Sequence, residues 1–171
     1  MVAAVVTLLV EYWAKPSLEA RKDAILEGQR LTRSVAAKLA LADHLFTKLF
    51  AYWKQDSPMQ SFEDPETTQA RVVATIDPVM EAVASGQMRT SNAARYAVMA
   101  YVALVEFWRD DVGGDHHENA QNAQEFCRLA ARALATPWWQ RAQLARIEDS
   151  LRGQGLAPEK GAAWPSGTPW Q

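Results

Sequence analysis

Apolar residues recur at spacings of three and four along a long stretch of the chain, from Ser17 to Gln55. Such spacing places them on one side of an α-helix, so it predicts a single helix about 58 Å long. Ser17, after Pro16, is suited to cap its start, and Gly28 is the expected weak point. The recurring positions are Ile25, Gly28, Thr32, Val35, Leu39, Ala42, Phe46, Leu49 and Trp53.

Three later helix starts share one device, in which a capping residue is followed by proline at the first helical position. Proline is suited there because that amide has no partner within the helix. The pattern predicts helices over residues 65–76, 78–85 and 137–152, with Gly86 ending the second of them. The three pairs are Asp64-Pro65, Asp77-Pro78 and Thr136-Pro137.

The segment from Tyr96 to Trp108 contains Glu106 as its only charged residue. A helix that is apolar nearly all round belongs in the middle of a bundle, so we expect a central helix here, begun by Ser91. A further helix is predicted over residues 115–135. The chain is thus expected to be an all-α, single-domain bundle of about six to seven helices at 1–152, with a long second helix. Residues 153–171 are predicted to form an irregular tail rich in Trp and Pro.

The first 13 residues are largely apolar, with Glu11 among them, and their pattern fits either a buried helix or a strand. They are shorter than the roughly 20 residues that span a bilayer, and no basic residue precedes the apolar run. We therefore expect neither a membrane span nor a signal peptide. Cys127 is the only cysteine, which favours a reducing compartment, and we expect a cytoplasmic protein.

Charge is distributed unevenly, although the whole chain carries only −2. Residues 1–55 have a net charge of +3, and residues 56–86 have −5. A basic ribbon is predicted opposite the apolar side of the long helix. It could bind nucleic acid in a ribonucleoprotein complex, or it could pair with the acidic segment of the same chain. Its residues are Lys22, Arg30, Arg33 and Lys48, with His44 beside them.

A cluster of carboxylates and imidazoles lies at the joint between two predicted helices. Such side chains can bind zinc, manganese or iron. Acids are also favoured at a helix start by its dipole, and adjacent histidines point about 100° apart on a helix. We therefore expect no metal site and no cofactor. The candidates are Asp110, Asp111, Asp115, His116, His117 and Glu118.

Arg109 and His116 are separated by six residues, and this spacing resembles the Arg-x(4 to 6)-His motif of HEPN ribonucleases, which are also helical bundles. The resemblance covers these two residues. It implies that Arg109 would stabilise phosphate charge and that His116 would act as an acid or base. In the HEPN motif the pair lies on one helical surface, whereas Gly113 and Gly114 intervene here.

Seven tryptophans are many for this length, and four of them lie outside the predicted core positions. Tryptophan is enriched at protein interfaces, so Trp138, Trp139, Trp164 and Trp170 are the candidate partner-binding residues. The leading hypothesis is a non-enzymatic helical subunit that binds another protein or a second copy of itself. A nucleic-acid-binding subunit and a HEPN-like nuclease are the alternatives.

Overall fold

The computed structural model describes residues 15–54, 64–88, 90–110 and 116–157, and its regular structure in these ranges is entirely α-helical. This confirms the all-α class. None of the described helices is long and apolar enough to cross a bilayer. The helices are α2 (Lys15–Trp53), α3 (Pro65–Val73), α4 (Ile76–Ala84), α5 (Asn92–Arg109), α6 (His116–Ala135) and α7 (Arg141–Gly153).

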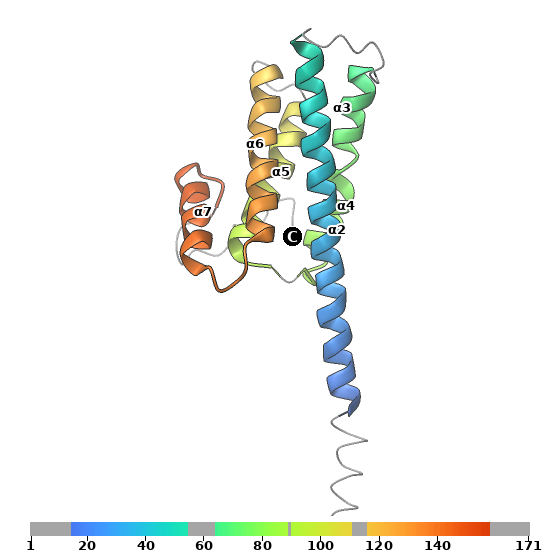
Figure 1. Ribbon diagram of the computed structural model, residues 1–171, viewed down its shortest axis with the longest axis vertical. Coiled ribbons are helices and arrows are strands. Elements are labelled where there is room, and N and C mark those ends of the chain that lie inside the picture. Colours follow the sequence, from blue (N-terminus) through green and yellow to red (C-terminus); the bar gives the residue numbers. More distant parts are fainter. Residues whose placement is uncertain (1–14, 55–63, 89, 111–115, 158–171) are drawn as a thin grey trace, which may run out of the picture.

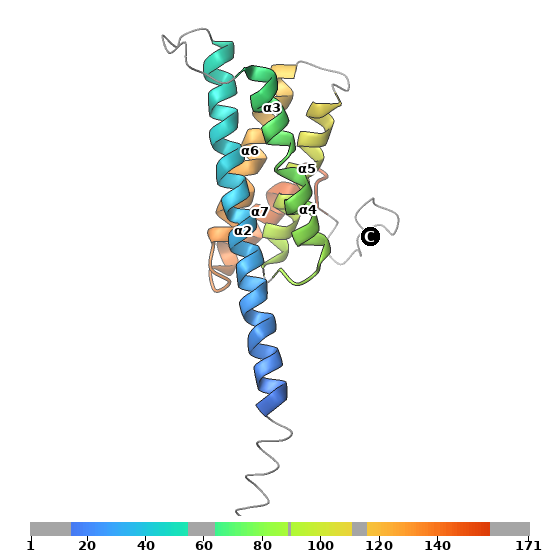
Figure 2. The same cartoon turned by 90° about the vertical axis from the view of Figure 1, so that its right-hand side faces the viewer.

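The helices run up and down along a common axis, with α3 and α4 running in the same direction (Figure 1, Figure 2). Helix α2 occupies one corner, and α3 and α4 follow one another back along it, so together they take the place of a single helix. Helices α5 and α6 complete the bundle, as short connections between antiparallel neighbours favour. Helix α7 lies to one side, where it packs against α5 and α6.

Helix α5 is the centre of the core, as the single charged residue between Tyr96 and Trp108 predicts. It packs against α3, α4, α6 and α7. Half of its 18 residues are buried, including Tyr101 and Trp108, which are fully covered. Its start also agrees with the sequence, because the Ser91 hydroxyl accepts a hydrogen bond of 3.2 Å from the Ala94 amide. The packing on nearly all sides leaves little of α5 exposed.

Helix α2 extends well past the rest of the bundle at its N-terminal end (Figure 1, Figure 2). We call residues 15–27 the arm. Its described side chains are exposed apart from Ile25, whereas Gly28, at its base, is buried. The helix runs unbroken through Gly28, and its described part already includes Lys15, so Ser17 lies inside the helix and the predicted cap at Ser17 is wrong.

The joint between α3 and α4 differs from the predicted one. Helix α3 ends at Val73 and α4 begins at Ile76, so Asp77-Pro78 lies inside the first turn of α4, where proline is tolerated. The joint is fixed by Thr75, whose hydroxyl donates to the Val72 carbonyl at 2.7 Å and accepts from the Tyr101 hydroxyl at 3.1 Å. The boundary between α3 and α4 therefore lies where Thr75 contacts α5.

The start of α7 was also predicted wrongly. Residues 137–140 form a turn closed by a 2.9 Å hydrogen bond from the Gln140 amide to the Pro137 carbonyl, and the helix begins at Arg141. Thr136 does not cap α7. Instead its amide and hydroxyl both donate to the Arg132 carbonyl, which completes the end of α6. Two predictions hold: Asp64-Pro65 begins α3, and Gly86 has a φ of 64° after α4.

The buried face of α5 can be tested with a matched pair of substitutions. Ala100 is buried and Ala103, one turn away, is exposed. Ala100→Asp should destabilise the fold by several kcal/mol, because it buries an unpaired carboxylate, and Ala103→Asp should change stability by less than about 0.5 kcal/mol. Thermal unfolding followed by circular dichroism measures both. Equal melting temperatures for the two variants would contradict this placement of α5.

Candidate functional site

The candidate catalytic arginine lies at the C-terminal end of α5 and is engaged locally. The Arg109 Nε donates to the Asp110 Oδ1 at 2.8 Å, and both side chains are exposed. This hydrogen bond lowers the pKa of the Asp110 carboxyl and raises the pKa of the Arg109 guanidinium. Asp110 is therefore a charged surface group paired with its neighbour.

The two histidines at the start of α6 lie against aromatic rings from α2 and α5. The His116 ring centroid is 5.2 Å from that of Trp108 and 5.8 Å from that of Trp53. The His117 ring lies 5.3 Å from Trp53 and 5.3 Å from Phe50. Both imidazoles thus help to close this end of the core.

Neither metal binding nor nuclease chemistry gains support from this arrangement. Among the residues that the structure describes, no three His, Cys, Asp or Glu side chains lie close enough together to hold a metal ion. Glu118 is exposed, and Asp111 and Asp115 lie outside the described ranges. The HEPN resemblance of Arg109 and His116 stays a prediction.

The basic ribbon of α2 is present but not uniform. Lys22, Arg30 and Arg33 are exposed, whereas Lys48 is half-buried. The Arg30 Nη1 lies 3.6 Å from the Glu27 Oε2 on the same helix, so this carboxylate already compensates part of the arginine charge. Nucleic-acid binding by this ribbon stays a prediction.

Trp138 and Trp139 are the most exposed large apolar side chains of the described chain, at 71% and 66%. They lie in the turn between α6 and α7. Their ring centroids are 5.9 Å apart and their planes meet at 83°, so the edge of one ring contacts the face of the other. This edge-to-face arrangement is the one favoured by the ring quadrupoles. Trp164 and Trp170 lie outside the described residues.

Helix α7 presents two different sides. Leu144, Ile147 and Leu151 are buried and hold the helix to the bundle. Ala142 and Ala145 are exposed, together with the tryptophans that precede the helix. In the described structure, other helices therefore cover the side with Leu144, Ile147 and Leu151, and the side with Ala142 and Ala145 stays uncovered.

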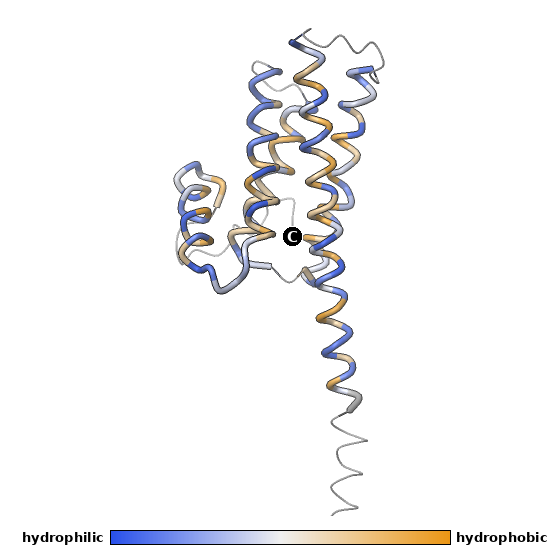
Figure 3. Tube along the Cα trace, viewed as in Figure 1, coloured by the Kyte–Doolittle hydropathy of each residue, from blue (hydrophilic) through white to orange (hydrophobic). Residues whose placement is uncertain are grey.

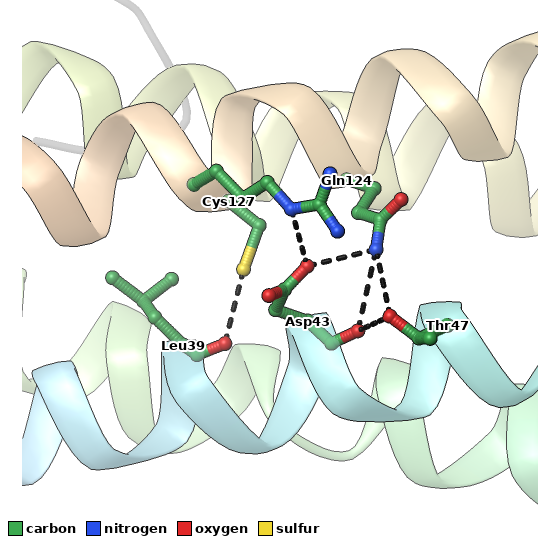
Figure 4. A network of polar contacts seen from close by, with 6 residues as sticks. Leu39, Asp43, Thr47, Gln124 and Cys127 are labelled. Atoms are coloured by element: carbon green, nitrogen blue, oxygen red, sulfur yellow. Dashed lines mark hydrogen bonds and ion pairs between the residues drawn. The ribbon is translucent and has the colours of Figure 1, made fainter.

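The contact between α2 and α6 is fixed by a polar network that sequence reasoning missed (Figure 4). The Asp43 Oδ1 accepts from the Arg128 Nε at 2.7 Å and from the Gln124 Nε2 at 2.8 Å. Gln124 also reaches the Thr47 hydroxyl at 3.2 Å. One turn away, the Cys127 thiol donates to the Leu39 carbonyl at 3.1 Å. These polar groups are matched only at one register between the helices.

Exposed apolar residues on the arm were also missed. Leu18 is 62% exposed and Leu26 is 42% exposed. Figure 3 shows apolar positions continuing along α2 beyond the end of the bundle. The pattern of the sequence contained this signal, because the spacing of Leu18, Ile25 and Thr32 continues that of the buried positions. The sequence pattern does not indicate where along α2 the other helices end.

In comparisons with models of protein families, with curated proteins and with solved structures, no match to this chain was found.

Because Trp108 is buried and Trp138 is exposed, their substitution should lower the free energy of unfolding by different amounts. Trp108→Ala should destabilise the protein by about 3 to 5 kcal/mol, because it removes a fully buried ring from between Phe46 and His116. Trp138→Ser should change stability by less than about 0.5 kcal/mol. Urea unfolding monitored by circular dichroism gives both values. A large loss for Trp138→Ser would show that its ring packs in the fold.

Burial of Cys127 predicts an inert thiol. Burial, with a smaller contribution from the charge of Asp43, raises the pKa of the thiol to about 12. Ellman's reagent at pH 8 should therefore react with native protein far more slowly than with urea-unfolded protein, because the thiolate is the reactive form. The raised pKa also means that the neutral thiol favours the folded state below pH 9, and that this contribution is lost as the pH rises from 9 towards 12. Equal reaction rates for native and unfolded protein would contradict the buried position.

Proposed function

We propose that this chain is a non-enzymatic helical subunit that binds another protein through the turn between α6 and α7 and the exposed side of α7. We call Trp138, Trp139, Ala142 and Ala145 the tryptophan surface. One observation carries the proposal: both tryptophans are about two-thirds exposed, although Trp108 of the same chain is fully buried. Clustered exposed apolar residues are typical of interaction sites.

The size of the tryptophan surface indicates what a partner has to cover. Two tryptophans bury roughly 300 to 500 Å² when they are covered completely. A stable interface takes about 800 Å² from each partner. The pair therefore suits the centre of an interface, and neighbouring surfaces have to supply the rest.

The arm is suited to supply part of that remaining area. The end of α6, the start of α7 and the arm all lie at the same end of the bundle (Figure 1, Figure 2). Four of the seven large apolar side chains that are exposed in the described residues belong to these segments: Leu18, Leu26, Trp138 and Trp139. A partner bound at this end could contact both.

The backbone that carries the tryptophans is also fixed before binding. Their turn is closed by its own backbone hydrogen bond, and it is anchored on one side by α6 and on the other by the buried residues of α7. A turn whose backbone is already ordered loses little backbone entropy on binding, which raises the affinity of an interface. This supports a binding role for the pair.

The test uses proteins that co-purify with the full chain from the cells that produce it. Partners identified by mass spectrometry are then purified, and binding is measured with the reconstituted pair. The double variant Trp138→Ser/Trp139→Ser should weaken binding by a hundredfold or more, since truncating a central tryptophan costs about 2 kcal/mol or more. Phe107→Ser is the matched control, because Phe107 is an exposed aromatic residue on α5.

The control should bind as the native chain does, and circular dichroism should show that all variants are folded. A reconstituted partner that binds the double variant and the native chain equally well would contradict the proposal. Turnover of a substrate by the purified chain would contradict its non-enzymatic part.

A further inference from the structure

The stretch of chain that carries the tryptophan surface contains charged residues of one sign only. Residues 126–147 contain four arginines and no aspartate or glutamate. Arg128 is held by Asp43 in the contact between α2 and α6. Arg132, Arg141 and Arg146 are exposed, and none of the three forms an ion pair within the described structure.

The nearest carboxylates along α7 do not compensate these charges. Glu148 and Asp149 both accept hydrogen bonds from Arg152, at 2.8 Å and 2.6 Å. They are therefore engaged by an arginine further along the same helix. The tryptophan surface is left with three positive side chains and no free negative one from the neighbouring part of α7.

The start of α7 adds to this positive charge. Its first turn contains no acidic residue, and Gln140 makes no side-chain capping hydrogen bond. A helix N-terminus carries a partial positive charge that acidic residues usually offset. Here Arg141 occupies the first position of the helix, so its charge adds to that of the dipole. An arginine at position 141 does not stabilise the start of α7, so helix stability does not explain its presence there.

We infer that the partner of the tryptophan surface is a protein segment that carries carboxylates on either side of a large apolar residue. The apolar residue packs against Trp138 and Trp139, and the carboxylates pair with Arg132, Arg141 and Arg146. This inference rests on the proposed function and names the chemistry of its partner. Carboxylates are the natural complement, because arginine binds them through two parallel hydrogen bonds.

The geometry of the tryptophan pair favours a protein over single-stranded nucleic acid. Successive stacked bases have parallel planes, and a stacking site needs ring faces aligned with them. The two rings here meet at 83°, so parallel bases cannot stack on both of them. An apolar side chain has no such requirement, and it can fill the angle between the two rings.

The experiment selects short random peptides from a phage-displayed library on the immobilised full chain, with counter-selection on the Trp138→Ser/Trp139→Ser variant. We expect the selected peptides to be enriched in Asp and Glu around a large apolar residue. Changing their Glu and Asp to Gln and Asn should weaken binding at least tenfold. Replacing Arg132, Arg141 and Arg146 together with Gln should weaken it similarly and reduce its dependence on salt.

A second set of probes tests other ligands that could bind the tryptophan surface. These are single-stranded oligouridine, phosphatidylcholine vesicles with and without phosphatidylserine, and the chain itself in sedimentation. We expect none of them to bind in a way that depends on Trp138 and Trp139. Stronger tryptophan-dependent binding of RNA, of anionic vesicles or of a second copy than of the peptides would overturn the inference.

The outcomes separate the inference from the proposed function. Peptides that need the tryptophans but show no enrichment in acidic residues would overturn the acidic partner and leave protein binding in place. Failure to select any peptide that prefers the native chain over the tryptophan variant would overturn both. Selected peptides that bind the arginine variant and the native chain equally well would overturn the role of the arginines.

Discussion

The architecture depends on the burial of α5. A helix with one charged residue between Tyr96 and Trp108 has no side that water solvates well, so other helices have to cover it. Helices α3, α4, α6 and α7 do so, and the tight turn at Thr75 is held by a hydrogen bond to Tyr101 of this helix. The order of the remaining helices follows from this requirement and from the short connections between them.

Apolar packing around α5 does not by itself determine how α2 and α6 are aligned along their axes. Asp43 supplies this alignment, because its carboxylate has to receive the hydrogen bonds of both Gln124 and Arg128. A shift of one helix along the other would leave half-buried polar groups without partners, which costs free energy. The alignment also determines how far the arm extends past the end of α6, and so where the arm lies relative to Trp138 and Trp139.

The division of the tryptophans between core and surface connects the fold to the proposed function. Trp108 closes the core at one end of the bundle with His116, and the turn with Trp138 and Trp139 lies at the other end. The same residue type therefore stabilises the fold at one end and remains available for a partner at the other. In the proposed complex, the exposed arginines near this pair in the chain would favour partners of opposite charge.

Much of this protein follows from local patterns in the sequence. The periodicity of α2, the apolar character of α5, the helix start at Asp64-Pro65, the cap at Ser91 and the left-handed Gly86 depend on neighbours within a few residues, so the sequence alone predicts them. The adjacent tryptophans Trp138 and Trp139 are also visible in the sequence. Their role as a binding surface was predicted from residue type alone.

Other features depend on residues far apart in the chain, and only the tertiary structure decided them. The break at Thr75 replaced the expected one at Asp77 because Tyr101 binds its hydroxyl, and Thr136 ends α6 instead of beginning α7. Pairing of Asp43 with Gln124 and Arg128 joins residues about 80 positions apart, which no local pattern indicates. The same is true of the arm: its apolar spacing matches that of the buried part of α2, and its exposure results only from where the other helices end.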